Sequence, residues 1–159
     1  MGDDLRHRSI LRAGLVLLAL PAVVIGLWTL VAPHDFYANF PGGGRHWVSA
    51  LPPYNEHLLR DFGSANLTIA LVLLGAAWLL ERHLIQVALV AYIVGTLAHA
   101  GYHLTTTNHY STGDNLASLG GFAVEVILAL ALLFLTREIV RASEAQPPVG
   151  SSPSRSAPS

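Results

Sequence analysis

Histidines and carboxylates gather next to long apolar segments of the chain. His99 and His103 are four residues apart near the end of one segment, and Glu56, His57 and Asp61 precede another. Imidazole and carboxylate groups are ligands of transition metals, and residues at i, i+4 share one helical face. The five residues therefore predict a site for a divalent metal such as zinc, iron or copper. Two weaker candidates for the same ligand shell are His109 and Asp114.

The spacing leaves a second interpretation open. No His-Glu-x-x-His or comparable motif accompanies these histidines, and the chain has no cysteine to supply a thiolate. The same side chains could instead form hydrogen bonds between helices, to Asn66, Asp61 or loop carbonyls. Haem ligation by His99 and His103 is disfavoured, because axial ligands approach opposite faces of the ring.

Three further polar residues lie within or beside the apolar segments. Glu125 is near the middle of one segment, where an acid is costly unless it is paired or protonated. It is either a proton-relay group or ion site, or a protonated acid bonded to a neighbouring helix. Asn66 lies at a depth comparable to that of the histidines. Arg60 is either a substrate contact or, more simply, part of a salt-bridged helix cap with Glu56.

The elements that carry these residues are predicted to be membrane-spanning helices. Hydrophobic residues make up 52% of the 159 residues and charged ones 12%, against about 25% in a soluble domain. A helix needs about 20 apolar residues to cross a hydrocarbon core of roughly 30 Å. The predicted fold class is all-α, a polytopic membrane protein with four transmembrane helices in an antiparallel bundle. The spans are 13–32, 62–80, 84–104 and 116–136.

Arginine positions predict the orientation of a multi-pass protein in the cell membrane, with both termini cytoplasmic. Only Arg45 and Arg60 fall outside the cytoplasm in this arrangement. The first span is too long for a cleaved signal peptide, whose apolar region has about 7–15 residues. The cytoplasmic arginines are Arg6, Arg8, Arg12, Arg82, Arg137, Arg141 and Arg155. The extramembrane parts are a 1–12 segment, outer loops 33–61 and 105–115, and a 137–159 tail, disordered from about 143.

Small residues at helical spacing predict which way the buried polar groups point. Membrane helices approach closely where small side chains line one face. At about 1.5 Å per residue, His99 would lie roughly 7 Å and Glu125 roughly 14 Å below the outer surface. The pattern predicts a polar funnel that narrows from the outer loops toward Glu125. The predicted packing faces are Ala91, Gly95, His99 and His103; Ala117, Gly121, Glu125 and Ala129; and Gly63, Asn66, Ala70, Leu73 and Ala77.

The run Pro-Gly-Gly-Gly-Arg-His-Trp at 41–47 is rich in glycine. It lacks the Gly-Lys-Ser/Thr ending of a phosphate loop. A turn at the membrane surface, with Trp47 and Tyr54 as interfacial anchors, is the simpler interpretation. We therefore predict a turn and not a phosphate site.

Part of the sequence resembles a known group of membrane proteins. The chain is similar to uncharacterised actinobacterial four-helix membrane proteins in Phe36-Tyr37, Phe40-Pro41-Gly42 and Pro52-Pro53-Tyr54-Asn55-Glu56-His57-Leu58-Leu59-Arg60-Asp61-Phe62-Gly63. Its size and helix layout over residues 10–140 distantly resemble the DoxX-like group. The resemblance implies a four-helix fold and a link to quinone-coupled redox complexes. No catalytic residue of that group matches a position here.

Three functions are compatible with these residues. The preferred hypothesis is an outward-facing metal-binding pocket of a membrane-embedded oxidoreductase or hydrolase that acts on a lipophilic or redox substrate. The alternatives are a non-catalytic accessory or scaffold subunit of a quinone-linked membrane complex, and a small transporter that uses Glu125. Expected partners are the lipid bilayer, other membrane subunits or further copies of the chain. The net charge of −1 gives no basis for nucleic-acid binding.

Overall fold

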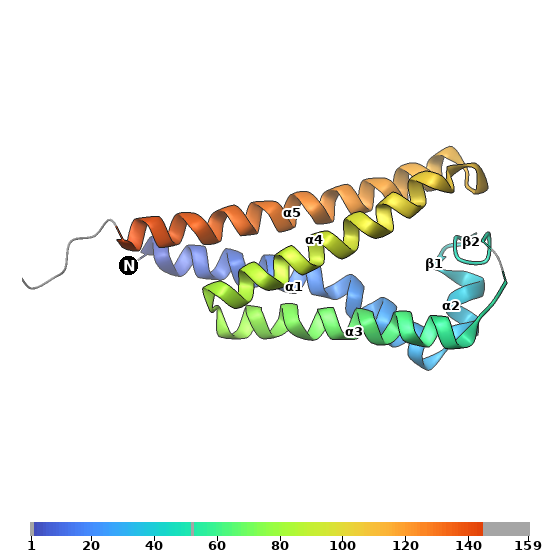
Figure 1. Cartoon of the computed structure of the whole chain (residues 1–159), viewed down its shortest axis with the longest axis horizontal. Helices are drawn as coiled ribbons and strands as arrows, with labels where there is room; N and C mark the ends of the chain where they lie inside the picture. Colours follow the sequence, from blue (N-terminus) through green and yellow to red (C-terminus); the bar gives the residue numbers. More distant parts are fainter. Residues whose placement is uncertain (1, 52, 145–159) are drawn as a thin grey trace, which may run out of the picture.

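The protein is a bundle of four long helices (Figure 1). The structure is a computed structural model that describes residues 2–51 and 53–144. All four helices are long and apolar enough to cross a membrane, which confirms the predicted all-α membrane fold. The predicted disordered tail lies outside the described residues from 145 onward. The helices are α1 (Gly2–Val31), α3 (Glu56–Leu79), α4 (Arg82–Thr105) and α5 (Thr112–Glu144).

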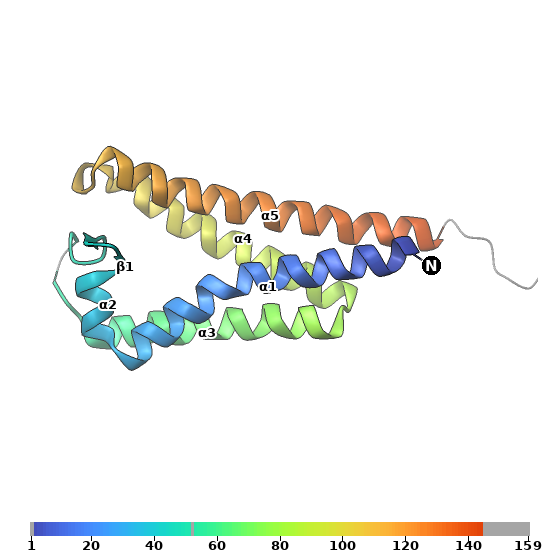
Figure 2. The ribbon, with the colours of Figure 1, turned by 180° about the vertical axis from the view of Figure 1, so that it is seen from behind.

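The bundle has two unlike ends. At one end α1 begins, α5 ends and α3 is connected to α4, and we call this the terminal end. We call the opposite end the loop end (Figures 1 and 2). The four helices lie close together at the terminal end. Toward the loop end the pair α1 and α3 separates from the pair α4 and α5. One face of a helix therefore meets different surroundings at the two ends.

Large aliphatic side chains fill the terminal half of the bundle. Leu15 of α1, Leu73 of α3 and Leu89 of α4 are fully buried. α1 also lies close to α5 at Gly14. A Cβ atom added at Gly14 would be only 2.6 Å from the Cδ2 atom of Leu132. Van der Waals packing of this kind drives the association of helices in a bilayer. The core is thus tightest where the four helices converge.

The turn between α3 and α4 closes the terminal end. Leu80 ends α3 in a left-handed conformation with φ 51°. The Glu81 carboxylate then caps α4 by accepting hydrogen bonds from the backbone N–H groups of His83 and Leu84. These two bonds hold the pKa of Glu81 below its usual value.

α1 and α3 cross closely at two glycines. A Cβ added at Gly63 would collide with Thr29 and lie 3.1 Å from the carbonyl oxygen of Gly26. One added at Gly26 would lie 2.7 Å from the Cγ atom of Leu67. The crossing confirms the predicted packing face of the second span. On that face Gly63, Ala70, Leu73 and Ala77 are buried and Asn66 is half-buried.

The first long connection is more structured than the predicted outer loop. It contains the short helix α2 (Pro33–Asn39), which an aromatic cluster holds in place. The Phe36 ring lies 5.5 Å from Trp28 of α1, 4.7 Å from Phe40 and 6.5 Å from Phe62 of α3. Aromatic burial therefore folds this segment back over the α1–α3 pair.

A two-residue hairpin, β1 (Pro41–Gly42) and β2 (Arg45–His46), follows α2. The glycines at 42, 43 and 44 have φ values of 99°, 64° and 77°, which glycine adopts without a steric penalty. The predicted glycine turn is thus confirmed. The second connection contains the short 3-10 helix η1 (Thr107–His109).

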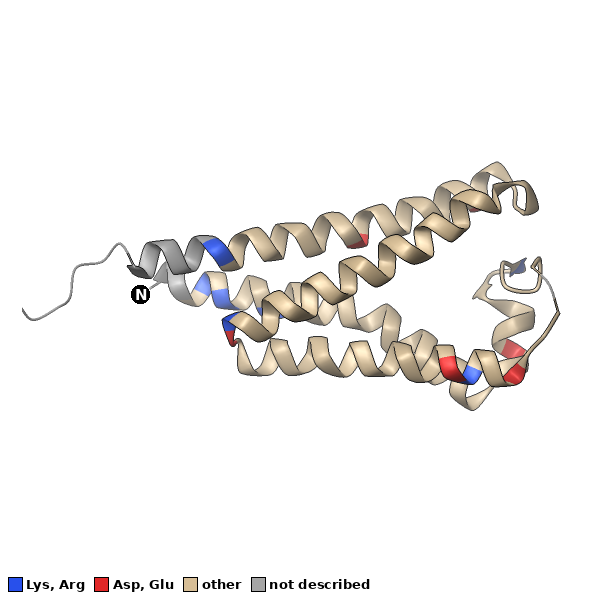
Figure 3. Cartoon of the chain, in the orientation of Figure 1, with Lys and Arg blue, Asp and Glu red and all other residues tan. Residues whose placement is uncertain are grey.

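Charged residues mark the two ends of the bundle (Figure 3). The loop end carries Arg45 and Arg60 together with acidic residues. Glu125 is an exception, because it lies well inside the candidate membrane span Thr112–Arg137. The described arginines of the terminal end are Arg6, Arg8, Arg12, Arg82 and Arg137.

Candidate functional site

Two histidine rings of α4 lie together toward the loop end. The ring centroids of His99 and His103 are 4.9 Å apart, which confirms that the two share one helical face. Phe122 of α5 lies 4.9 Å from His99 and 5.3 Å from His103. The pair is therefore in contact with α5 through an aromatic ring.

His99 lies between three helices and is nevertheless exposed. Besides Phe122 of α5, it meets the edge of Phe62 of α3, with ring centroids 6.1 Å apart. His99 is exposed although rings from two other helices contact it. An exposed imidazole can exchange hydrogen bonds with a molecule that reaches it.

His103 lies closer to the loop end and is half-buried. The ring of Tyr110 stacks on it, with centroids 6.0 Å apart and an interplanar angle of 28°. The Nδ1 atom of His103 is buried and has no hydrogen-bond partner among the described residues. A buried polar atom without a partner costs roughly 1–3 kcal/mol. The site is therefore short of one hydrogen-bonding group.

Tyr110 connects the histidines to the hairpin. Its hydroxyl donates a hydrogen bond of 2.8 Å to the backbone carbonyl of Trp47. Burial and the neighbouring Tyr102 raise the pKa of Tyr110. The phenol thus stays neutral, and its proton remains in this bond at physiological pH.

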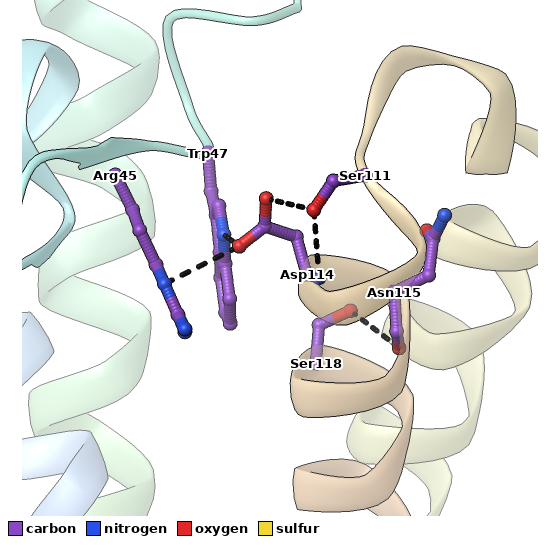
Figure 4. A network of polar contacts seen from close by, with 6 residues as sticks. All are labelled: Arg45, Trp47, Ser111, Asp114, Asn115 and Ser118. Atoms are coloured by element: carbon purple, nitrogen blue, oxygen red, sulfur yellow. Dashed lines mark hydrogen bonds and ion pairs between the residues drawn. The ribbon is translucent and has the colours of Figure 1, made fainter.

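Asp114 joins the hairpin to the start of α5 (Figure 4). Its Oδ1 atom accepts a hydrogen bond of 2.9 Å from Trp47 Nε1 and lies 3.4 Å from Arg45 Nε. Its Oδ2 atom accepts a bond from the Ser111 hydroxyl, which in turn accepts one from the Asp114 N–H. This reciprocal cap fixes the first turn of α5. We call Arg45, Trp47, Tyr110 and Asp114 the loop-end latch, because they bridge the two helix pairs.

The other predicted metal ligands bond elsewhere. Glu56 pairs with Arg60 at 2.8 Å, and Asp61 with His57 at 3.3 Å. His109 is exposed. Among the residues whose side chains the structure describes, 5–51 and 53–137, no group of three or more histidines, aspartates and glutamates could hold a metal ion. The predicted ligand set is not brought together, and metal binding stays a prediction.

Arg60 forms an ion pair with Glu56 at the start of α3, as in the predicted salt-bridged helix cap. Its Nε atom donates to Glu56, and its second guanidinium nitrogen donates a 2.6 Å bond to the carbonyl of Leu30. The N-cap of α3 is Asn55, whose side chain accepts from the N–H of Leu58. Arg60 therefore ties the start of α3 to the last turn of α1.

Glu125 lies at the deep end of a polar face. It is half-buried and interacts with Tyr92 of α4, which also meets Thr96. Tyr92, Thr96, His99 and His103 follow one another at intervals of four and three residues, so they share one face of α4. Polar groups therefore extend along α4 from the level of Glu125 to the loop end.

The packing faces of α4 and α5 differ from the predicted ones. On α4, Ala91 and Gly95 are exposed, whereas Tyr92 is buried. On α5, Ala117 and Gly121 are exposed, and only Ala129 of the predicted small residues is fully buried. Ala91 is exposed because it points to a different side of α4 from its buried neighbour Tyr92. At Gly95, Ala117 and Gly121 the prediction is wrong because the helix pairs diverge toward the loop end. The small residues at that level consequently have no partner to approach.

Asn66 was predicted to point into the bundle as a partner for the histidines. Its side-chain amide instead donates a 2.9 Å hydrogen bond to the carbonyl of Phe62, four residues earlier in α3. Such a bond satisfies the amide within its own helix. Asn66 therefore does not depend on a second helix.

Sequence reasoning missed the aromatic residues of the site. Tyr92 lies seven residues before His99 and Phe122 three before Glu125, so helical spacing could have found both. Trp47 carried no such signal. Its partner Asp114 is 67 residues away, and only the folded chain brings them together.

No known protein family, curated protein or solved structure matches this chain. The resemblance to actinobacterial and DoxX-like membrane proteins therefore stays a prediction.

Proposed function

We propose that this integral membrane protein binds a lipid-soluble molecule that carries a flat ring and a hydrogen-bonding group, at His99 and His103. The exposure of His99 between rings from two other helices is the observation that carries the proposal. A polar side chain within a membrane span is costly unless it finds a partner. A bound molecule would supply that partner.

The neighbouring side chains suit a ligand of this kind. Phe62 and Phe122 offer ring edges and faces to an aromatic or quinoid ring. The exposed imidazole of His99 offers the hydrogen bonds, and the buried Nδ1 atom of the adjacent His103 has no partner among the described residues. Pockets for small molecules commonly combine an apolar lining with a few polar groups that fix orientation.

The distribution of arginine supports an orientation for the ligand site. Arg6, Arg8, Arg12, Arg82 and Arg137 lie at the terminal end, whereas Arg45 and Arg60 lie at the loop end. Arginine is enriched on the cytoplasmic side of membrane proteins. The loop end, and with it the exposed side chain of His99, would then face the outside of the cell membrane. The ligand would enter from the outer leaflet.

The test begins with purification of the protein in mild detergent. The lipophilic molecules that remain bound are then extracted and identified by mass spectrometry. The double variant His99→Phe/His103→Phe keeps both aromatic rings and removes the hydrogen-bonding nitrogens. His109→Phe is the matched control, because His109 is exposed in η1. We expect one near-stoichiometric compound in the wild type and the control, and its loss in the double variant.

Two results would contradict the proposal. The same extract from all three proteins would show that the histidines do not select a ligand. A metal that is present in the wild type and absent from the double variant would instead establish the metal site. Elemental analysis of the same samples distinguishes these cases. If a partner polypeptide is lost together with the histidines, the accessory-subunit alternative is the correct one.

A further inference from the structure

A hollow lies between α1 and α5, and neither His99 nor His103 lines it. Its volume is about 370 Å³, near the lower end of the roughly 300–1,000 Å³ of small-molecule sites. Leu17 and Pro21 of α1 form one side, and Val124 and Leu128 of α5 form the other. The surface is almost entirely apolar, which suits a lipophilic occupant.

Two glycines keep this groove open. Gly120 and Gly121 both line it, and a Cβ added to either would meet no atom within 4 Å. The free space is therefore a property of these positions in α5. A larger side chain at either position would occupy the groove without disturbing the α4–α5 contact.

Glu125 is the titratable group in the groove lining. From α4 it faces Tyr92, whose ordinary pKa is about 10, and from α1 it faces apolar side chains. Among the described residues that line the groove, none is basic. A carboxylate at this depth is costly unless it is protonated or paired with a positive charge.

We propose that the groove between α1 and α5 binds a lipophilic organic cation, with its apolar body against Leu17 and Leu128 and its positive group beside Glu125. The apolar walls exclude small hydrated ions, which the groove could not solvate. In the empty groove Glu125 holds a proton. Binding of the cation releases that proton to water, so that one positive charge replaces another beside the carboxylate.

The experiment measures binding of methyltriphenylphosphonium to the protein in lipid nanodiscs by titration calorimetry. We expect saturable binding of one cation per chain, with an affinity that rises about tenfold per pH unit while Glu125 is protonated in the empty groove. Glu125→Gln should weaken binding about tenfold or more and abolish the pH dependence. Glu56→Gln, an exposed acid at the loop end, should leave both unchanged.

Two further variants test whether the cation occupies the groove and whether it binds apart from the histidine site. Gly121→Leu retains Glu125 and fills the groove, so it should also weaken binding while the helical content stays the same. His99→Phe/His103→Phe should bind the cation like the wild type, which separates this site from the one proposed above. Equal binding by Glu125→Gln, or no saturable binding, would overturn the proposal. Equally tight binding of neutral 1,1,1-triphenylethane would also overturn it, because the groove would then accept any apolar molecule.

Discussion

The two ends of the bundle are built from different kinds of contact. At the terminal end, fully buried leucines such as Leu73 and Leu89 pack between helices, and Gly14 lets α1 touch α5. At the loop end, ring edges, two histidines and a polar latch connect the two helix pairs, while Gly26 and Gly63 keep α1 and α3 in close contact. Close packing between the two pairs is thus concentrated at the terminal end, and the groups suited to recognition lie at the other. Sites that bind ligands often depart from good packing in this way.

The loop-end latch explains how the opening persists without the helix pairs falling apart. Trp47 and Arg45 come from the hairpin, whereas Asp114 belongs to α5. Their contacts hold the pairs at a set distance, and His99 stays exposed between them. The latch therefore belongs to the architecture of the site, which it meets through the stack of Tyr110 on His103.

The largest effect is expected from removing a core side chain near the terminal end. Leu89→Ala should lower the free energy of unfolding by about 2–4 kcal/mol, because it leaves a cavity between closely packed helices. Leu97→Ala is the same change on the exposed side of the same helix and should cost less than about 0.5 kcal/mol. Unfolding in mixed detergent micelles, followed by circular dichroism, measures both. Similar losses would refute the contrast between buried and exposed positions.

The loop-end latch should contribute less to the free energy of unfolding than the buried core side chains do. Trp47→Phe keeps the contact with Phe40 and removes the donor to Asp114, so it should cost about 1 kcal/mol. Trp78→Phe, at an exposed position, should change stability by less than about 0.5 kcal/mol. Spin labels on α3 and α5 at the loop end would report the separation of the pairs. An unchanged distance distribution in Trp47→Phe would show that the latch does not set the opening.

Replacing His103 by a residue without ring nitrogens should leave the free energy of unfolding unchanged or raise it. His103→Phe preserves the ring stack with Tyr110 and eliminates the unpartnered Nδ1 atom. We expect the free energy of unfolding of the ligand-free protein to stay the same or to rise by up to about 1 kcal/mol. The same detergent titration measures this. A clear loss of stability would mean that His103 has a structural bond and is not held in reserve for a ligand.

The smallest effect concerns Glu81 at the terminal end. Its folded pKa is lowered by the two backbone hydrogen bonds that it accepts, so its stabilising contribution is complete above the unfolded pKa. The contribution is lost as the pH falls through the lowered folded pKa. The melting temperature of the wild type should therefore fall further between pH 7 and pH 3 than that of Glu81→Gln. Parallel curves for the two proteins would rule out this cap as a pH-sensitive element.

The fold was largely predictable because its signals are local. Each span is a long apolar segment, and the packing face of α3 through Gly63 follows from helical spacing. The i, i+4 pairing of His99 with His103 was predictable for the same reason. The glycine turn at residues 42–44 likewise needed only local conformational preference.

The rest of the site depends on how the helix pairs diverge. The exposure of Gly95 and Gly121 could not be predicted, because spacing identifies a face but not the distance to its partner. The role of Asp114 was also out of reach, since it bonds to Trp47 across 67 residues. Carboxylates near the start of α3 were assigned to a metal from composition alone, whereas Glu56 is paired with Arg60.

Cysteine labelling tests the central claim most directly, because the chain has no cysteine of its own. Single variants His99→Cys, Ala129→Cys and Val94→Cys would be placed in lipid nanodiscs after removal of bound lipophiles and treated with a water-soluble maleimide. Ala129 is fully buried, and Val94 is exposed on the opposite side of α4 from Tyr92. The account predicts that His99→Cys reacts many times faster than the other two. Equal rates at positions 99 and 129 would contradict an accessible binding site at His99.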